Sequence, residues 1–573
     1  MADQCNLNHP NKVAMPTVAT SSEPAKPRSY DLMLVLAVWL SLLAYGAVAA
    51  PIPAVNEPHY LCKAKHFWQP DWCAQDFFLA SPNAHTVFYI SIGWLPRWLS
   101  FEQTTWIGRA VAILVLALGW TSLTTRLFTR RWSPLVTCWL FLAFASCGSL
   151  SGEWLVGGVE GKVFSYGLLF ASLGQVLRAR IVLAGALAGM AIAFHPVVGA
   201  WGVLAFTGAC LVQRGTRSPE CGTKSQPVNP PLLTHSTLHV PSFALALISL
   251  VALSLPGLIP VIQLLLEPAP AATKYAATYI QVYYRLAHHL DPMLFPMRAY
   301  TGYFALFVFW LIGSRLEQKS DERLLFNRIV GWSILFALGG WLIGWGPRPA
   351  KLMPFFAERM NLLKFYPFRL ADVLLPLAVS VVVVGWLERR MSDHAKWSFG
   401  LKTDEEPGGL RPTRIGVRGL KPKLSMCGAL LLLAFALWRA HSVVEVNRYS
   451  GELRGDWIDA CRWIDRHLPT DALVQAPHNG WAFKWFAGRA EYVAFKDCPQ
   501  DAVGIVEWNR RLLFLKKWYE DQYIDQFYSA DELRGLRRET GITHLLTDRL
   551  GPLELEPVYR NDTFQVYDLS SLD

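Results

Sequence analysis

The chain has 573 residues, which is long enough for two domains, and only 17% of them are charged while 52% are hydrophobic. A mean hydropathy of +0.24 is modest for a membrane protein, so a polar portion must dilute the apolar segments. The net charge of +10 does not require a nucleic-acid partner, because the membrane topology described below accounts for it.

Apolar runs of about 17 to 25 residues are long enough to cross a bilayer, and about eleven such runs predict a polytopic α-helical membrane protein. The expected spans are 32–50, 106–125, 133–150, 162–178, 181–195, 197–212, 241–265, 298–313, 329–346, 370–387 and 425–440. Almost no loop separates 181–195 from 197–212, which predicts a tight hairpin or a kinked helix. Pro256 and Pro260 predict a kink within 241–265.

The first apolar run has two interpretations. Residues 47–50, Ala-Val-Ala-Ala, resemble a signal-peptidase site. The run is about 19 residues long, however, and about 30 residues precede it, which favours a retained anchor over a cleaved signal.

Lys and Arg set the expected orientation. With a cytoplasmic N-terminus, the inner side holds roughly twice as many Lys and Arg as the outer loops, as the positive-inside rule expects. The sequence therefore predicts a multi-pass protein of the inner (plasma) membrane with a disordered cytoplasmic segment at 1–30. It also predicts a membrane domain over 31–440, with cytoplasmic linkers at 213–240 and 391–423 and an outer loop at 51–105.

An odd number of spans places residues 441–573 outside, where the pattern predicts a small extracytoplasmic α/β domain. Apolar residues at helical spacing predict a helix over 456–464. The other expected elements are strands at 472–476, 492–495, 543–546 and 564–567 and a helix at 502–519.

Four cysteines fall on the expected outer side. Cys461 with Cys498, and Cys62 with Cys73, are the candidate pairs if the compartment is oxidising. Disulfides and free thiols both remain open interpretations for these pairs.

Acidic residues gather after the first span. Glu57 follows the expected membrane exit, and Asp71 and Asp76 come close behind. Charged groups near membrane depth are costly and tend to be kept for function, although a polar residue that merely ends a helix gives the same pattern.

Two short stretches carry a family resemblance. Residues 151–162 follow the third span and end in Glu160-Gly161-Lys162, which resembles the stretch of oligosaccharyltransferase catalytic subunits that ends in Glu-Gly. Residues 483–489 end in Ala-Gly-Arg, like a run in related membrane mannosyltransferases. Together with the layout, the chain resembles the GT-C superfamily of polyprenyl-phosphate-dependent membrane glycosyltransferases, and also a group of uncharacterised bacterial membrane proteins.

The chain departs from that family at two points. Many members carry two adjacent acids in the first loop, whereas Asn56 and Pro58 flank Glu57 here. The tail contains no Trp-Trp-Asp-type motif, which argues against protein N-glycosylation.

The resemblance implies sugar transfer, which needs a base for the acceptor hydroxyl and cations for the departing phosphate. Glu57 is the expected base, with Asp71 or Asp76 assisting. A divalent metal, Mg²⁺ or Mn²⁺, would instead use Glu57, Glu153 and Glu160. The last two also fit solvated loop acids, and Glu160 fits an ion pair with Lys162. The expected phosphate ligands and acceptor-groove residues are Arg369, Arg359 and Lys364, and His59, His288 and His289.

The resemblance therefore implies transfer of a sugar from a polyprenyl-phosphate donor to an envelope acceptor at the outer face of the bilayer. The lipid bilayer and the lipid-linked sugar are the expected partners. We further expect Glu57, Asp76, Glu160 and Arg369 to converge on one polar cavity roofed by the tail. A transporter or flippase of an amphiphilic substrate, or a non-catalytic envelope scaffold, remain the alternatives.

Overall fold

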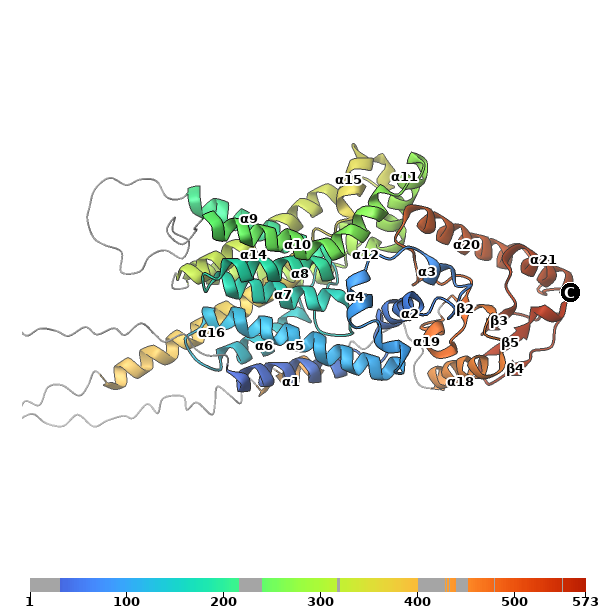
Figure 1. Ribbon diagram of the computed structural model, residues 1–573, viewed down its shortest axis with the longest axis horizontal. Coiled ribbons are helices and arrows are strands. Elements are labelled where there is room, and N and C mark those ends of the chain that lie inside the picture. Colours follow the sequence, from blue (N-terminus) through green and yellow to red (C-terminus); the bar gives the residue numbers. More distant parts are fainter. Residues whose placement is uncertain are drawn as a thin grey trace, which may run out of the picture.

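The computed structural model describes residues 31–215, 240–316, 320–399, 428, 430–431, 433–438, 452–478, 480–548 and 550–572. Long apolar helices form one end of the molecule and a small sheet with its helices forms the other (Figure 1). The N-terminal segment 1–30, almost all of the linker 213–240, the linker beyond residue 399 and part of the span 425–440 lie outside the described residues.

Each of the ten expected spans before residue 400 falls on a helix. These helices are α1 (Leu32–Ala49), α5 (Phe101–Leu127), α6 (Ser133–Ala145), α7 (Gly161–Val176), α8 (Ile181–Phe194), α9 (Pro196–Gly215), α10 (Val240–Leu266), α13 (Met297–Leu316), α14 (Asp321–Gly344) and α16 (Arg369–Phe399). Within the described residues, six of them (α1, α5, α10, α13, α14 and α16) are long and apolar enough to cross a membrane, and α6, α8 and α9 contain shorter apolar helices. The total of about eleven spans stays a prediction.

Two details of the helical region decide between interpretations. His195 is extended (φ −150°, ψ 93°) between α8 and α9, and the two helices pack together, so this pair is a hairpin. Helix α16 continues to Phe399, so the expected start of a linker at residue 391 is wrong.

Short helices cover the end of the bundle that faces the sheet. The first outer segment forms α2 (Glu57–Trp68), α3 (Phe77–Ala80), α4 (Thr86–Ser91) and η1 (Leu95–Arg97). Later connections add α11 (Ala271–Ile280), a π-helical turn η2 (Gln281–Arg285), α12 (Ala287–Leu290), η3 (Pro292–Leu294), η4 (Ala350–Leu352) and α15 (Phe356–Leu363).

The tail contains a five-stranded mixed sheet in the order β2-β1-β3-β5-β4. Its strands are β1 (Leu473–Gln475), β2 (Ala490–Glu491), β3 (His544–Thr547), β4 (Tyr559–Arg560) and β5 (Gln565–Asp568). The first three run parallel, and β5 pairs antiparallel with both β3 and β4. The strand expected at 492–495 is wrong in position, because the paired residues of β2 end at Val474↔Glu491.

Four helices accompany the sheet: α18 (Glu452–His467), α19 (Phe483–Ala487), α20 (Ala502–Asp521) and α21 (Ala530–Thr540). Trp457, Cys461 and Ile464 of α18 are buried with strand residues, as the helical spacing in the sequence predicts. A short 3₁₀ turn, η5 (Leu569–Leu572), follows the last strand.

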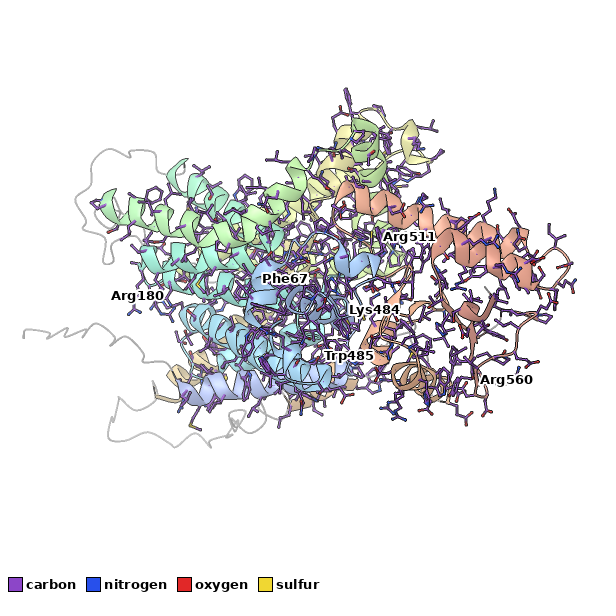
Figure 2. All side chains as sticks on the ribbon, turned by 45° about the vertical axis from the view of Figure 1, so that its right-hand side comes forward. Phe67, Arg180, Lys484, Trp485, Arg511 and Arg560 are labelled. Atoms are coloured by element: carbon purple, nitrogen blue, oxygen red, sulfur yellow. The ribbon has the colours of Figure 1, made fainter. Side chains whose placement is uncertain are left out.

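The tail packs directly on the end of the helical bundle. Trp485 stacks on Phe101 at 4.7 Å between ring centroids, and the Arg511 guanidinium lies 4.2 Å from the ring centre of Phe77. Lys484 and Trp485 lie where the bundle meets the tail (Figure 2). Helix α20 packs on α11, so the tail contacts two separate parts of the bundle.

Candidate functional site

A polar cavity of about 200 Å³ lies where the bundle, the short helices and the tail meet. Its walls come from the start of α2, the loop before α7, the α8–α9 junction, η2 with α12, the start of α16 and the tail. The Glu, His, Lys and Arg residues that line it are His59, Glu153, Glu160, Lys162, His195, Arg285, His288, His289, Arg369 and Lys496. Four of these are Lys or Arg and two are acids, so the cavity favours an anion.

Glu160 and Lys162 come from the loop that opens α7. The Glu160 Oε1 atom accepts a hydrogen bond from Asn56 Nδ2 at 2.7 Å, and its Oε2 lies 3.5 Å from Lys162 Nζ. The Lys162 ammonium lies 3.7 Å from the ring centre of Trp154. Glu160 precedes the first residue of α7 but makes no capping hydrogen bond, so its carboxylate is directed to these partners instead.

Glu153 joins the same group from the preceding turn. Its Oε1 lies 3.6 Å from Lys162 Nζ, and its Oε2 lies 3.1 Å from Arg369 Nε. Arg369 also lies over the Tyr366 ring at 4.1 Å and contacts His195 Nε2 through Nη1 at 3.1 Å. Lys162 therefore stands between two carboxylates, and Arg369 flanks the group.

Three polar atoms of cavity residues are buried without a hydrogen-bond partner among the described residues. They are Glu153 Oε1, Arg369 Nε and Arg285 Nε, of which the first two take part in the ion pairs to Lys162 and Glu153 given above. Buried polar groups in native proteins are nearly always satisfied, and exceptions call for a ligand, a water or a functional role. A polar ligand in this cavity would supply the missing partners.

Two further cations line the cavity, Arg285 from the bundle and Lys496 from the tail. Arg285 ends the π-helical turn η2, a feature that often marks functional sites, and its Nη2 donates to the Lys496 carbonyl at 2.9 Å. Burial lowers the pKa of Lys496 to about 8, and the nearby Arg285 acts in the same direction. An anion bound here would raise the pKa of Lys496 again and so favour its charged form.

Asp372, one turn into α16, fixes the loop that carries Glu153. Its carboxylate accepts from the backbone N–H groups of Leu150 and Ser151, both at 2.8 Å, and from the Ser151 hydroxyl at 2.7 Å. Gly152 follows with φ +75°, a conformation that favours glycine, and a Cβ there would lie in ordinary contact with the His289 ring at 3.5 Å. Asp372 thus links the position of Glu153 to that of Arg369 on the same helix.

All three histidines expected in an acceptor groove line the cavity. His289 Nδ1 lies 2.5 Å from the Ser151 carbonyl, and burial lowers the pKa of His289 to about 3. His59 Nδ1 lies 3.0 Å from Asp497 Oδ1 in the tail. Their role toward an acceptor stays a prediction.

Glu57, the expected base, lies outside the cavity in a saturated ion pair. Arg109 Nε and Nη2 donate to its two oxygens at 2.7 and 2.8 Å, and the N–H groups of Val159 and Ala54 donate at 2.8 and 2.6 Å. The Glu57 side chain is fully buried. The expectation that it converges on the cavity is wrong, because α5 supplies an arginine that neutralises it.

Asp76 and Asp71 also lie elsewhere. Asp76 caps α3 through the Leu79 N–H, accepts from the Glu491 N–H at 3.0 Å and pairs with Lys484 at 3.3 Å. It joins the first outer segment to the tail and does not line the cavity, so its expected convergence is also wrong. Asp71 is exposed in a turn, away from the lining residues.

Of the three expected phosphate ligands, only Arg369 lines the cavity. Arg359 Nη1 donates to the carbonyls of Ile343 and Trp345 at 3.0 Å each. Lys364 lies against the Phe365 ring at 5.5 Å. Both residues have local partners near the bundle end, which removes them from the candidate phosphate site.

Of the two interpretations left open for the outer cysteines, the structure has free thiols, because none of the four is bonded to another. Cys461 is buried in α18 among residues of the tail core, whereas Cys498 lines the cavity. Cys62 and Cys73 are both buried in the bundle-side core without a bond. Spacing along the chain did not reveal these separate environments.

The carboxylates do not fit a divalent cation as they are arranged. No group of three or more His, Cys, Asp or Glu side chains able to hold a metal occurs in the part of the chain that the structure describes. Lys162 Nζ lies at 3.6 and 3.5 Å from Glu153 and Glu160, so an ammonium occupies the place between them. Metal ligands must instead turn their oxygens toward a shared ion at 2.0–2.6 Å.

Residues 455–514 match DUF6798, a domain of unknown function. This segment contains α19, β2 and the cavity residues Lys496, Cys498 and Gln500. No curated protein matches the chain in sequence.

The chain has neighbours among solved structures. ArnT from Cupriavidus metallidurans bound to undecaprenyl phosphate matches with a TM-score of 0.46 and 13% identity, over 95% of this chain and 99% of ArnT. The apo oligosaccharyltransferase of Archaeoglobus fulgidus matches with a TM-score of 0.42 and 12% identity, over 91% of this chain and 70% of its own. AglB from the same organism, with an inhibitory peptide and a dolichol-phosphate, gives 0.40 and 12% over the same shares.

These neighbours are 12–13% identical to the chain and have TM-scores below 0.5, so the likeness carries no argument about family, role or individual residues. The proposed function therefore rests on the cavity itself.

Proposed function

We propose that the protein is a membrane glycosyltransferase that moves a sugar from a polyprenyl-phosphate donor to an envelope acceptor at the outer face of the inner membrane. The proposal includes about eleven spans, a cytoplasmic N-terminus, and an extracytoplasmic α/β domain over 441–573. One observation carries it: a buried polar cavity with a cationic surplus lies at the end of the apolar bundle.

The position of the cavity suits a lipid-linked anion. A polyprenyl chain keeps its phosphate at the membrane boundary, and the residues that line this cavity come from both the apolar bundle and the polar tail. A second, mainly apolar cavity of about 270 Å³ lies against α1 and α6 and shares Glu153 and Trp154 with the first. The two cavities together suit a ligand with one polar and one apolar part.

The cations suit a departing phosphate. In sugar transfer, negative charge grows on the phosphate oxygen as its bond to the sugar breaks, and preorganised donors stabilise that charge. Arg369 presents a planar guanidinium whose Nε is ion-paired with Glu153 without a hydrogen bond, and Lys496 and Arg285 line the same cavity. Glu153 and Glu160 neutralise Lys162, so the positive charge left for an anion comes from Arg285, Arg369 and Lys496.

The test uses the purified full-length protein in lipid nanodiscs, supplied with lipid-linked sugars extracted from bacterial membranes. We expect release of free polyprenyl phosphate, measured by mass spectrometry, and a loss of about 10²-fold in rate for Arg369→Ala, because one charge-stabilising donor is removed. Arg359→Ala is the matched control and should keep the wild-type rate, since its guanidinium serves two backbone carbonyls outside the cavity.

Two outcomes would overturn the proposal. One is that no sugar fraction yields free polyprenyl phosphate although the protein is folded. The other is movement of intact lipid-linked sugar across the bilayer without its cleavage, which would assign the cavity to a transporter.

A further inference from the structure

The glycosyltransferase proposal leaves open which group accepts the proton of the acceptor hydroxyl. Glu57 cannot do so, because Arg109 and two backbone N–H groups occupy its carboxylate. Glu153 and Glu160 face the cavity but are paired with Lys162, and with Arg369 or Asn56. A carboxylate neutralised in this way is a weak base, so the proton acceptor must be sought among the other lining residues.

Four further lining residues carry an imidazole. His195 Nε2 is occupied by Arg369, and His289 is too weak a base with its pKa near 3. His288 lies against His289 and makes no hydrogen bond to a carboxylate among the described residues. His59 differs from all of them, because a carboxylate holds one of its ring nitrogens.

We propose that His59 is the catalytic base of the transfer, and that Asp497 of the tail is its positioning residue. The proposal rests on the glycosyltransferase function above. His59 lies in the first turn of α2 and lines the cavity, while its Nδ1 lies 3.0 Å from Asp497 Oδ1. An ionised carboxylate only accepts hydrogen bonds, so the ring hydrogen belongs on Nδ1 and the lone pair on Nε2.

The His59 Nε2 atom is free to act. It makes no hydrogen bond to any residue in the described ranges, and the ring is held by Phe78 at 4.5 Å between centroids. This is the arrangement by which a carboxylate orients a histidine in acyl-transfer triads and stabilises the imidazolium that forms. Here the carboxylate and the imidazole come from segments 438 positions apart.

Asp497 is itself fixed by a buried lysine. Lys484 Nζ lies 2.6 Å from Asp497 Oδ2, and it also pairs with Asp76 at 3.3 Å and Glu491 at 3.1 Å. Lys484 and the hydrogen bond to His59 hold the pKa of Asp497 well below its usual range. The carboxylate therefore stays ionised over the working pH range, as an orienting group must.

The other titratable groups around His59 come from three parts of the chain. Lys63 lies one turn along α2, and its ammonium donates to the carbonyls of Phe78 and Ser81. Lys496 adjoins Asp497 in the tail, and His85 precedes α4. Burial lowers the pKa of His59, the two lysines act in the same direction, and Asp497 opposes them. His59 is consequently neutral, and able to accept a proton, at pH 7.

The reaction balances as a single displacement. The acceptor O–H proton passes to His59 Nε2 while the acceptor oxygen forms a bond to the sugar C1. The bond between C1 and the phosphate oxygen breaks, and its electron pair stays on that oxygen. The phosphodiester monoanion becomes a phosphomonoester dianion, and the imidazole becomes an imidazolium, so total charge is unchanged.

The test compares His59→Ala with His66→Ala in the nanodisc assay. His66 lies two turns further along α2 and contacts the Trp72 carbonyl through Nδ1, but it does not line the cavity. We expect His59→Ala to lower the transfer rate by about 10² to 10⁴-fold and added imidazole to restore part of it, with neither effect in His66→Ala. His59→Gln, which keeps the side-chain volume, should show the same loss with the thermal stability of the wild type.

The pH profile tests the role of Asp497. Transfer should rise with pH along a limb below 6.5, where neutral His59 forms. Asp497→Asn should move this limb to lower pH, because the carboxylate that raises the pKa of His59 is lost, and it should also lower the plateau. A merely structural aspartate would leave the midpoint of the limb in place.

The outcomes separate the two proposals. If wild-type protein releases no polyprenyl phosphate, the glycosyltransferase function itself fails. The base assignment fails alone if the wild-type protein transfers sugar and both His59→Ala and His59→Gln keep the wild-type rate. It also fails if added imidazole restores no rate to a folded His59→Ala variant that still gains thermal stability from polyprenyl phosphate.

Discussion

Two groups of buried charge lie close together at the end of the bundle and behave in opposite ways. Glu57 and Arg109 satisfy each other, and every carboxylate oxygen has two donors. In the cavity, Glu153 Oε1 and Arg369 Nε are buried in ion pairs but make no hydrogen bond among the described residues. Burial alone therefore does not identify a functional acid. What distinguishes the cavity is burial combined with partners left for a ligand to supply.

The largest expected effect comes from removing Arg109, the cation of the first group. Arg109→Met should lower the free energy of unfolding by about 3–5 kcal/mol, because Glu57 is left buried and uncompensated. Thermal or denaturant unfolding in detergent measures the loss. Arg180→Met is the control, since Arg180 is exposed at the far end of the bundle (Figure 2). Equal stability of the two variants would mean that Glu57 is not neutralised by Arg109.

The second prediction concerns the removal of Lys162, the cation between the two cavity carboxylates. Lys162→Met should lower the free energy of unfolding by a smaller amount, about 1–3 kcal/mol, because water entering the cavity can solvate Glu153 and Glu160. The variant should also gain thermal stability from Mn²⁺, since two carboxylates then face each other without an ammonium between them. Wild-type protein should gain none. A wild-type gain that equals that of the variant would contradict the reading that Lys162 excludes a divalent ion.

The smallest expected effect concerns the thiols. Reductant should leave the melting temperature of wild-type protein unchanged, because the structure has no bond between Cys461 and Cys498 to break. A disulfide there would contribute about 2–4 kcal/mol, which a melting curve would detect. Maleimide should modify Cys498 in the cavity of the native protein and leave buried Cys461 unmodified until unfolding. If maleimide modified Cys461 and Cys498 of the native protein at the same rate, the two thiols would be equally accessible, which would contradict this prediction.

The helical part of the fold is predictable from sequence because a bilayer imposes a length. The ten expected spans before residue 400 coincide with helices for that reason. Short elements escaped prediction: α2, α3 and α4 carry mixed polar and apolar residues whose burial depends on the tail that covers them. The two-residue strand β2 has too few residues to show an alternating pattern.

The site was predictable where the type of a residue and its place in the expected topology pointed the same way, as for His59, His288 and His289 in the outer segments. Glu153, Glu160 and Lys162 share one loop, and Arg369 opens an apolar helix, so their types and places were visible. Whether an acid is neutralised could not be predicted, because Arg109 lies 52 positions from Glu57 in the sequence and meets it only in the fold. Lys496 and Arg285, which are 211 positions apart, gave no signal as a pair.

The roof of the cavity has a consequence for biogenesis. Lys496, Pro499 and Gln500 form part of its wall, and Asp497 reaches His59 from the same segment. These residues follow every described apolar helix along the chain, so a ribosome makes the bundle walls of the cavity before the wall that the tail supplies. Until the tail has been made and has packed on the bundle, the cavity stays open on that side. The ring of His59 then also lacks the Asp497 carboxylate that holds its Nδ1, so the bundle alone has only part of the proposed site.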